Sequence, residues 1–391
     1  MKTIEYPTSI PDGAGYDYVD IEDEIVKSVL ASPHSKMLFR MYDNIVELEH
    51  KEGARNTTGM DVRHIDTHYA MQSLLRRSVA IKRSGYDYYP RALVKKVMGR
   101  VTFELPRLDG FVGYPIITKS GDLVTATGYN AETNLFVGLD TVFDGFAVPD
   151  HVLTNEDIAR ARQQVSRAFA HVPMSSVNQS KHVAALLTLV MRDWFDVAPL
   201  MCFVNKGSYC FDEYDLYLGA LFLACDGTNA QHVRVGRGNY MGMVHRFKQA
   251  CENGHTSVGV ESLDFVSKKA IQDCLTFSGK QFNNSNLRNA SVLFTAATDK
   301  KFVPEELKDK TLLVLTNKVT SAQRVPEWVY THDNHEVRVG VFQGLLMLVS
   351  SWLQAGCPAP TTSNILNPMF DDWYNCVAGV LEHNGYPSIS L

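Results

Sequence analysis

The amino-acid sequence predicts an α/β protein built around a mostly parallel sheet. From about residue 198 onward, short apolar runs alternate with helical patterns, and strands that alternate with helices usually pair in parallel through crossover connections. Hydrophobic residues make up 45% of the chain and charged residues 21%, which is ordinary globular usage and excludes a disordered chain, collagen and a long coiled coil. At about 150 residues per domain, the length of 391 residues predicts about two to three domains.

The first 150 residues predict a flexible arm followed by a mixed α+β domain. Residues 1–24 are polar and acidic and contain several Pro and Gly residues, so we expect a flexible N-terminal arm. Residues 25–150 combine helical and strand patterns and form the expected mixed domain. Its predicted elements are, in chain order, a helix at 21–30 that begins within the arm, a hairpin about Asp43 and Asn44, helices at 64–79 and 90–101, and strands within 116–136 that turn at Ser120, Gly121 and Asp122.

Residues 154–325 are predicted to form an αβα core. Thr154, followed three residues later by Asp157, indicates a capped helix at 154–170. A second helix is expected at 181–195. The alternating pattern that follows predicts strands at 198–204, 257–263, 291–297 and 311–315, with helices at 214–224, 240–253 and 268–276.

Residues 330–391 are predicted to form a C-terminal helical domain. Two strongly apolar helical patterns, at 337–353 and 370–383, account for half of this segment. Both are shorter than the roughly 18 uninterrupted apolar residues that a membrane-spanning helix needs. The polar N-terminus lacks the apolar core of a signal peptide. We therefore expect a cytoplasmic protein that does not contact a membrane.

Charge and cysteine content narrow the classes of partner. The chain has 38 Lys and Arg residues against 43 Asp and Glu residues, for a net charge of -5. Such a balance argues against coating DNA by bulk charge and leaves room for a local basic channel. The 7 cysteines show no Cys-x-x-Cys spacing, which is typical of a reduced protein without a disulfide framework or a zinc ribbon, and we expect no metal site.

Three stretches of the chain resemble the P-loop ATPases and helicases that serve DNA replication in bacteriophages and mobile elements. The stretches are residues 105–137, with a Leu-Pro step and a Gly-Asp turn, residues 158–199, and residues 335–386, whose spacing of Arg338, Trp352, Gly356 and Trp373 is the most specific signal. The resemblance is to the AAA+ and superfamily-3 types. It implies an AAA+-like core over 154–325, a helical lid over 330–391 and, if a phage encodes the protein, a place in the host cytoplasm.

The nucleotide site of that family departs from its pattern in this chain. A working phosphate loop reads Gly-x-x-x-x-Gly-Lys-Ser/Thr, because backbone N–H groups surround the phosphates while the Lys and the hydroxyl contact phosphate and magnesium. Residues 205–213 instead read NKGSYCFDE, with one glycine, Lys206 and two carboxylates. Glu261, near the end of the strand predicted at 257–263, and Asp264, directly after it, stand where the family holds its metal, although a cap of a strand-to-helix loop suits Glu261 better.

We therefore expect no catalytic residue and no cofactor, with ATP and magnesium as the alternative. The family supplies an arginine finger after the strand that corresponds to residues 291–297. This chain instead has Leu307, Lys308, Asp309 and Lys310 there. Without an arginine, nothing stabilises a transferring phosphoryl group at that position. The resemblance thus implies a pseudoenzyme with a degenerate Walker A motif, in which Lys206, Glu261 and Asp264 mark the former nucleotide site.

Basic residues gather locally in the second half of the chain. In helicases of this type, the loop before the sensor strand faces a central pore, and residues 276–289 occupy that place here. Its Lys280 and Arg288 suit phosphates and its Phe282 can stack on a base, although a solvated polar loop would look similar. The other candidate nucleic-acid contacts are Arg237, Lys268 and Lys269.

The function expected from these features is binding without ATP hydrolysis. The partners expected are single-stranded DNA, further copies of the chain in a homo-oligomer, and a replication protein. One alternative is an active replicative helicase or ATPase with a divergent phosphate loop. Another is a protein-binding inhibitor or decoy of a replication or defence assembly.

Overall fold

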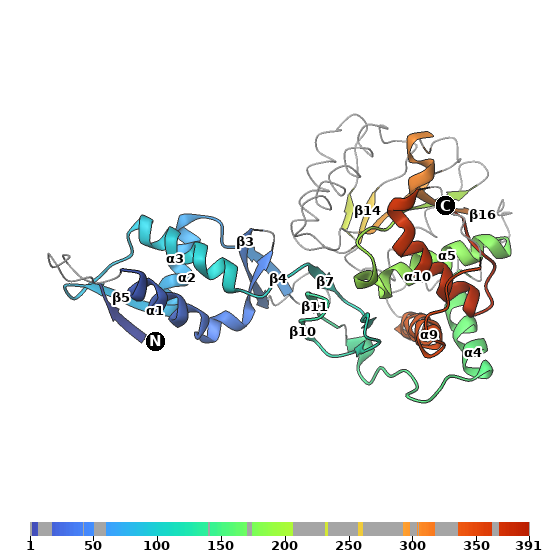
Figure 1. Ribbon diagram of the computed structural model, residues 1–391, viewed down its shortest axis with the longest axis horizontal. Coiled ribbons are helices and arrows are strands. Elements are labelled where there is room, and N and C mark those ends of the chain that lie inside the picture. The colour runs from blue at the N-terminus through green and yellow to red at the C-terminus, as the bar shows by residue number, and fades with distance from the viewer. Residues whose placement is uncertain are drawn as a thin grey trace. The chain divides into compact units, whose positions relative to one another are not determined.

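The computed structural model describes residues 2–6, 18–41, 43–50, 60–139, 141–169, 174–205, 231–233, 257–260, 292–297, 303, 305–316, 335–361 and 367–390. These residues form a mixed α/β protein that divides into two compact units (Figure 1). Unit 1 comprises Met1–Ala54 and Gly59–Leu108, and unit 2 comprises Arg55–Thr58 and Asp109–Leu391. Each unit has a hydrophobic core of its own.

The described residues of unit 1 form three α-helices that pack on two small sheets. The first sheet has the order β1-β5-β6, with β1 parallel to β5, and the second has the antiparallel order β2-β3-β4. Val29, Leu74 and Val97 come from the three helices and are fully buried in the shared core. The elements are β1 (Lys2–Glu5), α1 (Tyr18–Leu30), the 3-10 helix η1 (Pro33–Met37), β2 (Leu38–Met41), β3 (Asn44–His50), β4 (Met60–His64), α2 (His68–Ser78), β5 (Val79–Arg83), β6 (Tyr86–Asp87) and α3 (Arg91–Glu104).

Several predicted elements of unit 1 are shorter or different in the structure. The helix expected at 64–79 is α2, which begins after Thr67, whose hydroxyl accepts a hydrogen bond from the Ala70 amide (3.2 Å), and ends before the β-branched Val79. Pro90 caps α3 instead of standing in its first turn. Within the expected flexible arm, Lys2–Glu5 forms β1, paired with β5, and α1 begins at Tyr18. The predicted hairpin about Asp43 is confirmed as β2 and β3.

The sheet of unit 2 is the parallel sheet that the sequence predicts. Its strands are β12 (Leu200–Asn205), β13 (Gln231–Val233), β14 (Ser257–Val260), β15 (Val292–Ala297) and β16 (Thr311–Thr316). Their order is β13-β14-β15-β12-β16, and all neighbours are parallel. β12, which comes first in the sequence among these five strands, therefore lies between β15 and β16, which come last. The side chains of β12 are buried from Leu200 to Val204.

In the part of unit 2 that the structure describes, four α-helices pack around the apolar core beside this sheet. They are α4 (Asn155–Ser166), α5 (Ser176–Val190), α9 (His335–Gln354) and α10 (Asp371–His383), with the 3-10 helices η2 (Thr141–Phe143), η3 (Arg192–Trp194), η5 (Glu305–Lys310) and η7 (Pro368–Phe370). Residues of α9 and α10 belong to one buried cluster with α4 and α5, so the C-terminal helices are part of this core (Figure 1). An apolar helix such as α9 must be covered on most sides.

Residues 109–150, expected in the N-terminal domain, pack on unit 2. They form the sheet β10-β11-β7 and the hairpin β8-β9. Tyr114 stacks on Phe342 of α9 with ring centroids 4.8 Å apart, and Phe143 meets the same ring edge-on at 5.6 Å, which ties the segment to the helices. The turn predicted at Gly121 joins β8 and β9, with φ of 91°. The strands are β7 (Gly110–Val112), β8 (Ile116–Ile117), β9 (Leu123–Val124), β10 (Gly128–Asn130) and β11 (Leu135–Val137).

One stretch among the described residues has the length and hydropathy of a membrane-spanning helix. It is Glu336–Gln354 in α9, with a mean hydropathy of 1.2. Within the fold, 61% of its apolar window is buried, as in the core helix of a soluble protein. Length and composition alone are weak evidence for a membrane span.

Candidate functional site

The carboxyl ends of β12 and β15 mark a topological switch point in the sheet of unit 2. These two strands are neighbours, with Val204 opposite Ala297. From β12 the chain continues to β13 at one edge of the sheet, and from β15 it continues to β16 on the other side of β12. In open α/β sheets, ligands bind in the crevice outside the carboxyl ends of strands at such a point. The carboxyl ends of β12 and β15 are therefore the first candidate site.

The predicted nucleotide-site residues follow these strand ends in the sequence. Lys206 comes directly after Asn205, the last residue of β12, and Glu261 comes directly after Val260, the last residue of β14. Lys206, Glu261 and Asp264 themselves lie outside the described residues. So do all of the predicted nucleic-acid contacts, namely Arg237, Lys268, Lys269, Lys280, Phe282 and Arg288. Their roles stay predictions.

The segment without an arginine finger is described. Residues 307–310 belong to η5, in which Lys308 forms an ion pair with Glu305. Asp309 accepts a hydrogen bond from the Asn367 side chain (3.0 Å). Lys308 thus has its partner within η5, and Asp309 has its partner just before η7.

A lysine that the sequence analysis did not select lies near the carboxyl end of β16. The side-chain oxygen of Asn178, in the first turn of α5, accepts a hydrogen bond from the Leu315 amide (2.9 Å), which fixes the start of α5 beside that strand end. Lys181 is one turn further along the same face of α5. Burial lowers its pKa, and among the described residues it has no ion-pair partner. A partly desolvated cation near the carboxyl edge of the sheet is a candidate contact for an anion.

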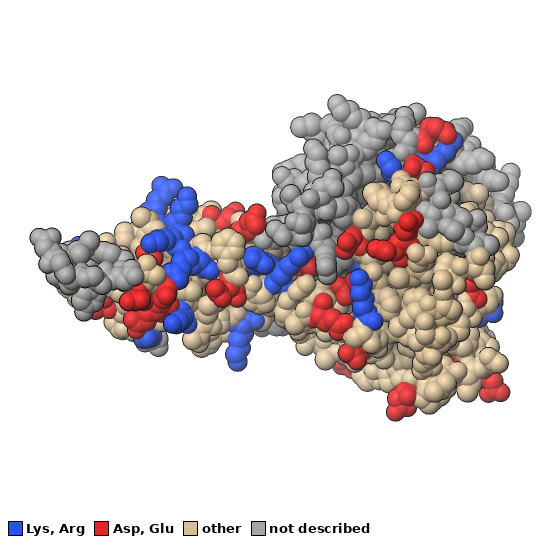
Figure 2. Space-filling model, in the orientation of Figure 1, with Lys and Arg blue, Asp and Glu red and all other residues tan. Residues whose placement is uncertain are grey.

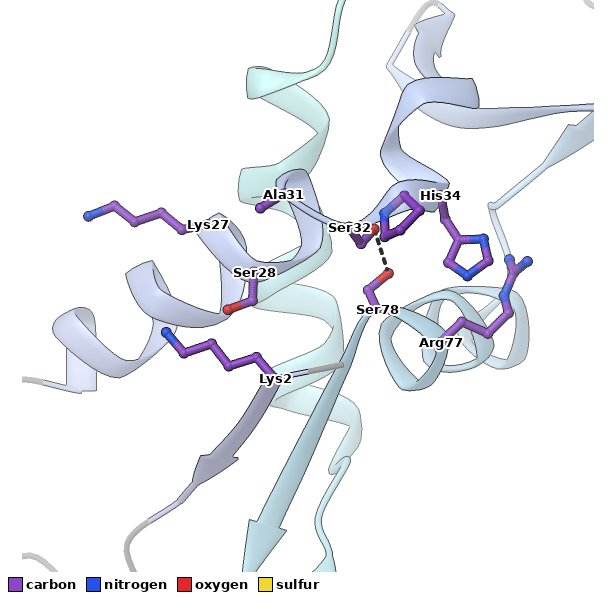
Figure 3. A pocket seen from close by; sticks show the side chains of 9 residues that line it. Lys2, Lys27, Ser28, Ala31, Ser32, His34, Arg77 and Ser78 are labelled. Atoms are coloured by element: carbon purple, nitrogen blue, oxygen red, sulfur yellow. Dashed lines mark hydrogen bonds between the residues drawn. The ribbon is translucent and has the colours of Figure 1, made fainter.

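A second candidate site is a cavity of about 580 Å³ in unit 1. Four elements contribute to it: β1, α1, η1 and the last turn of α2. Its lining carries four basic side chains and three hydroxyls (Figure 3). We call this the unit 1 cavity, and its lining residues are Lys2, Lys27, Ser28, Ala31, Ser32, Pro33, His34, Arg77 and Ser78.

Two of the basic side chains are held by carboxylates that do not line the cavity. Arg77 donates two hydrogen bonds to Glu47 (2.9 and 3.2 Å), and Glu47 is nearly buried and also pairs with Arg63. Lys2 pairs with Glu24, with 2.6 Å between Nζ and Oε1. These contacts position the two cations, because a bidentate arginine pair fixes the plane of the guanidinium.

The other two basic side chains, Lys27 and His34, are exposed. Neither has a hydrogen bond or ion pair with another described residue. No Asp or Glu is among the lining residues. The electrostatics of the unit 1 cavity therefore favour an anion, and Figure 2 shows that Lys and Arg side chains also gather elsewhere on unit 1, mixed with Asp and Glu.

Among the described residues, no group of three or more His, Cys, Asp or Glu side chains is close enough to hold a metal ion, and Glu261 and Asp264 of the first candidate site lie outside those residues. In Figure 2 the surface of unit 2 has broad uncharged areas with scattered Asp and Glu.

No protein-family model matches the chain, and no curated protein sequence matches it. Among solved structures, the chain is similar to "SCCmec type IV Cch - active helicase", with 11% identity. The match covers 89% of this chain and 69% of that chain, and the TM-score is 0.34. At this TM-score the likeness establishes neither a shared fold nor a shared function.

Proposed function

We propose that this chain is a helicase-like protein that binds nucleic acid and does not hydrolyse ATP. The observation that carries the proposal is the parallel sheet with β12 at its switch point, followed in the sequence by a segment without a phosphate loop. A protein of this kind has the sheet edge at which α/β proteins bind ligands. It lacks the residue types that hold a triphosphate and its magnesium ion.

Electrostatics support the absence of hydrolysis. The segment after β12 contains Asp212 and Glu213 and no Gly-Lys-Ser/Thr step. Two unit charges about 4 Å apart interact by about 4 kcal/mol at the effective dielectric of a protein surface, so carboxylates near a triphosphate would cost more than Lys206 alone recovers. We include in the proposal an AAA+-like core, self-assembly into a homo-oligomer and a role in the DNA replication of a phage or mobile element.

Phosphate release from ATP tests the first part of the proposal. We expect the rate to equal the background with and without single-stranded DNA, because the phosphate grips are missing. Magnesium-ATP should also leave the melting temperature unchanged, since a ligand that binds only the native state raises it. Lys206→Ala and Lys181→Ala serve as paired variants. A hydrolysis rate well above background that Lys206→Ala abolishes contradicts the proposal and favours an active ATPase.

Fluorescence anisotropy with a labelled single-stranded oligonucleotide tests the second part. Lys280→Ala combined with Arg288→Ala should weaken binding and reduce its dependence on salt, because each lost phosphate contact lowers the slope of log K against log salt by about 0.7. Lys119→Ala combined with Arg167→Ala removes two exposed charges outside the predicted loop and should change neither quantity.

The mass of the particle in solution completes this test. A closed ring with or without the oligonucleotide is expected for the helicase-like protein. If the full chain has no affinity for the oligonucleotide at low salt and stays a monomer, the proposal fails, and a protein-binding inhibitor explains the chain better.

A further inference from the structure

We propose that Cys357 and Cys376 are a modification site at which a small-molecule disulfide, such as glutathione disulfide, oxidises the folded chain and leaves a reversible disulfide between them. Both cysteines are free thiols in the structure and belong to the C-terminal part of unit 2. Cys357 follows the end of α9, and Cys376 is in the middle of α10. The proposal does not depend on nucleic-acid binding or on the nucleotide site.

The connection that follows α9 runs along α10 in the direction of the helix. The carbonyl oxygen of Pro358 lies 2.9 Å from the position that a Cβ on Gly379 would take. Three residues later, the amide and the hydroxyl of Thr361 both donate to the Glu382 carboxylate (2.7 Å each). Each step forward in the connection therefore corresponds to a step toward the C-terminal end of α10, and each step back leads toward its N-terminal half.

This direction brings the two cysteines level with each other. Cys357 directly precedes Pro358, and Cys376 is one turn before Gly379 on the same face of α10. An electrostatic effect supports the same placement. Burial raises the pKa of the Cys376 thiol to about 11, and negative charge on Asp372 and on Cys357 adds to the rise. Such an effect requires the two sulfur atoms to be neighbours, because charge interactions fall off with distance.

Hydrogen bonds on both sides fix the backbone of Cys357. Its amide donates to the Trp352 carbonyl (3.0 Å), and the Trp352 indole Nε1 donates to the Pro358 carbonyl (2.9 Å), the same group that touches Gly379. The φ of Cys357 is 57°, in the left-handed region that residues other than glycine seldom adopt. The Cys357 thiol is thus held beside α10.

A purely structural explanation accounts for only one of the two cysteines. Cys376 is half-buried and packs against the apolar core of unit 2, where a cysteine serves as a small hydrophobic residue. Cys357 is exposed, and glycine or asparagine is the usual residue at a left-handed position after a helix. A reactive role for the thiol explains a cysteine there.

Exposure sets the order of the two chemical steps. The thiolate of Cys357, the exposed thiol, attacks one sulfur of glutathione disulfide, whose S–S bond breaks to release one glutathione and leave a mixed disulfide. The thiolate of Cys376 then attacks the Cys357 sulfur and displaces the second glutathione. Two protein thiols lose two electrons and two protons, which convert one glutathione disulfide into two glutathione thiols. Excess glutathione reverses both steps.

The disulfide would hold a segment that contacts the region before β16. Between the two cysteines lies Asn367, whose side chain donates to Asp309 of η5 (3.0 Å). Closing a loop of about 20 residues restricts the unfolded chain, so the oxidised protein should be more stable than the reduced protein. In a reducing compartment such a disulfide is transient and forms when the pool of small disulfides rises.

Peptide mapping of the full chain tests the site. The folded, reduced chain is incubated with glutathione disulfide, its remaining thiols are alkylated, and it is digested with trypsin. No Lys or Arg follows Arg338, so residues 339–391 form one peptide whose only cysteines are Cys357 and Cys376. We expect this peptide to carry neither an alkyl group nor glutathione. Further cleavage before Asp371 should give two pieces that separate only after reduction.

The variants test the order of the steps. Cys376→Ser should stop at the mixed disulfide, with glutathione on Cys357. Cys357→Ser should leave Cys376 without glutathione, because that thiol is half-buried and protonated at neutral pH. Cys202, fully buried in β12, is the matched internal control and should carry no glutathione in the same digest.

Urea unfolding gives an independent readout. Oxidation should raise the midpoint of the natural chain and leave the midpoints of Cys357→Ser and Cys376→Ser unchanged, since neither variant can close the loop. The proposal is overturned if both thiols of peptide 339–391 are alkylated, if each carries its own glutathione, or if Cys357 is joined to a cysteine elsewhere. Equal modification of Cys202 also overturns it, because the reaction would then not depend on the folded structure.

Discussion

Thr188 is a polar residue in α5, a helix that is buried along most of its length. Its hydroxyl donates to the Ala184 carbonyl (2.8 Å) and accepts a hydrogen bond from the indole Nε1 of Trp373 in α10 (2.8 Å). Both side chains are fully buried. A single hydroxyl thus satisfies a buried donor on the neighbouring helix, which explains why a polar residue is tolerated there.

Thr188→Val should destabilise unit 2 by about 1–3 kcal/mol, because the shape is kept while the indole N–H loses its acceptor. Thr188→Ser keeps the hydroxyl and should cost less, about 1 kcal/mol for the lost methyl group. Urea unfolding followed by tryptophan fluorescence measures both. A neutral Thr188→Val would show that the hydrogen bond between the hydroxyl and the Trp373 indole does not stabilise the fold.

Asp157 makes the stability of unit 2 depend on pH in the acidic range. Hydrogen bonds from the Thr154 hydroxyl and backbone amide and from His151 hold its pKa well below the usual value for an aspartate. The bond from the Thr154 amide, together with the bond from the Asp157 amide to the Thr154 hydroxyl oxygen (3.2 Å), forms the capping box of α4 that the sequence predicts. A carboxyl whose pKa is lower in the folded state stabilises the protein above its unfolded pKa of about 3.9, and this contribution is lost as the pH falls through the folded value.

Thermal melting at a series of pH values below about 5 should therefore show a smaller loss of stability for Asp157→Asn than for the natural chain. Above that pH range the variant should melt at a lower temperature, because the charged acceptor at the helix N-terminus is gone. Asp371→Asn, in the first turn of α10, is an exposed control that lacks such a box. Parallel pH profiles for Asp157→Asn and the natural chain would refute this explanation.

The close packing of α4 against α9 requires a glycine in α9. A Cβ on Gly344 of α9 would lie 2.6 Å from the Ala161 carbonyl and 2.9 Å from a Val165 methyl group in α4. The helices approach each other closely only because residue 344 has no side chain. Gly340, one turn earlier, faces Gln164 at 3.9 Å, an ordinary contact distance.

Gly344→Ala should destabilise unit 2 by about 1–3 kcal/mol, since backbone atoms of α4 cannot move aside cheaply. Gly340→Ala introduces the same methyl group into the same helix without a clash and should be neutral or stabilising by up to about 1 kcal/mol. Chemical unfolding measures the pair. A neutral Gly344→Ala would mean that the two helices can separate without loss.

Among helices and strands, the sequence predicts those that have a strong local pattern of apolar residues. The strands expected at 198–204 and 311–315 are β12 and β16, with ends that differ by one or two residues. α5 begins at Ser176, five residues before the start predicted at 181, because Ser175 caps the helix within a polar segment that has no apolar periodicity. The strands on either side of α2, β4 and β5, were not predicted, and only their end residues His64 and Val79 lie within the helix expected at 64–79.

The whole molecule consists of two units that each bury their own core, with the boundary between Leu108 and Asp109. Within unit 1, the amide of Arg40 donates to the Pro106 carbonyl (2.8 Å) and the amide of Leu108 donates to the Arg40 carbonyl (2.8 Å). These bonds attach the last residues of unit 1 to its own sheet. Domains above about 40–60 residues commonly fold alone.

A fragment of residues 1–108 should therefore fold independently and melt in one cooperative transition followed by circular dichroism. The fragment of residues 1–89, which lacks α3, is the comparison, and it should not fold because α3 contributes Val94, Val97 and Val101 to the core. A non-cooperative signal from the longer fragment would show that unit 1 needs the rest of the chain.

Sites assembled from distant residues are the least predictable part of this molecule. The unit 1 cavity takes its lining from positions between Lys2 and Ser78 on four elements, and no spacing rule connects them. Lys181 gains its position from the bond between Asn178 and Leu315, which are far apart in the sequence. The predicted nucleotide-site and nucleic-acid residues came instead from a family pattern, and they stay predictions.

The order of strands in unit 2 has a consequence for biosynthesis. Both neighbours of β12 come from residues 292–316, whereas β12 ends at Asn205. A nascent chain emerges from the ribosome N-terminal end first, so β12 leaves the exit tunnel long before either neighbour exists. Its backbone edges stay unpaired and its apolar side chains stay uncovered during that interval, which makes the nascent chain prone to aggregation and a client for chaperones that shield hydrophobic segments.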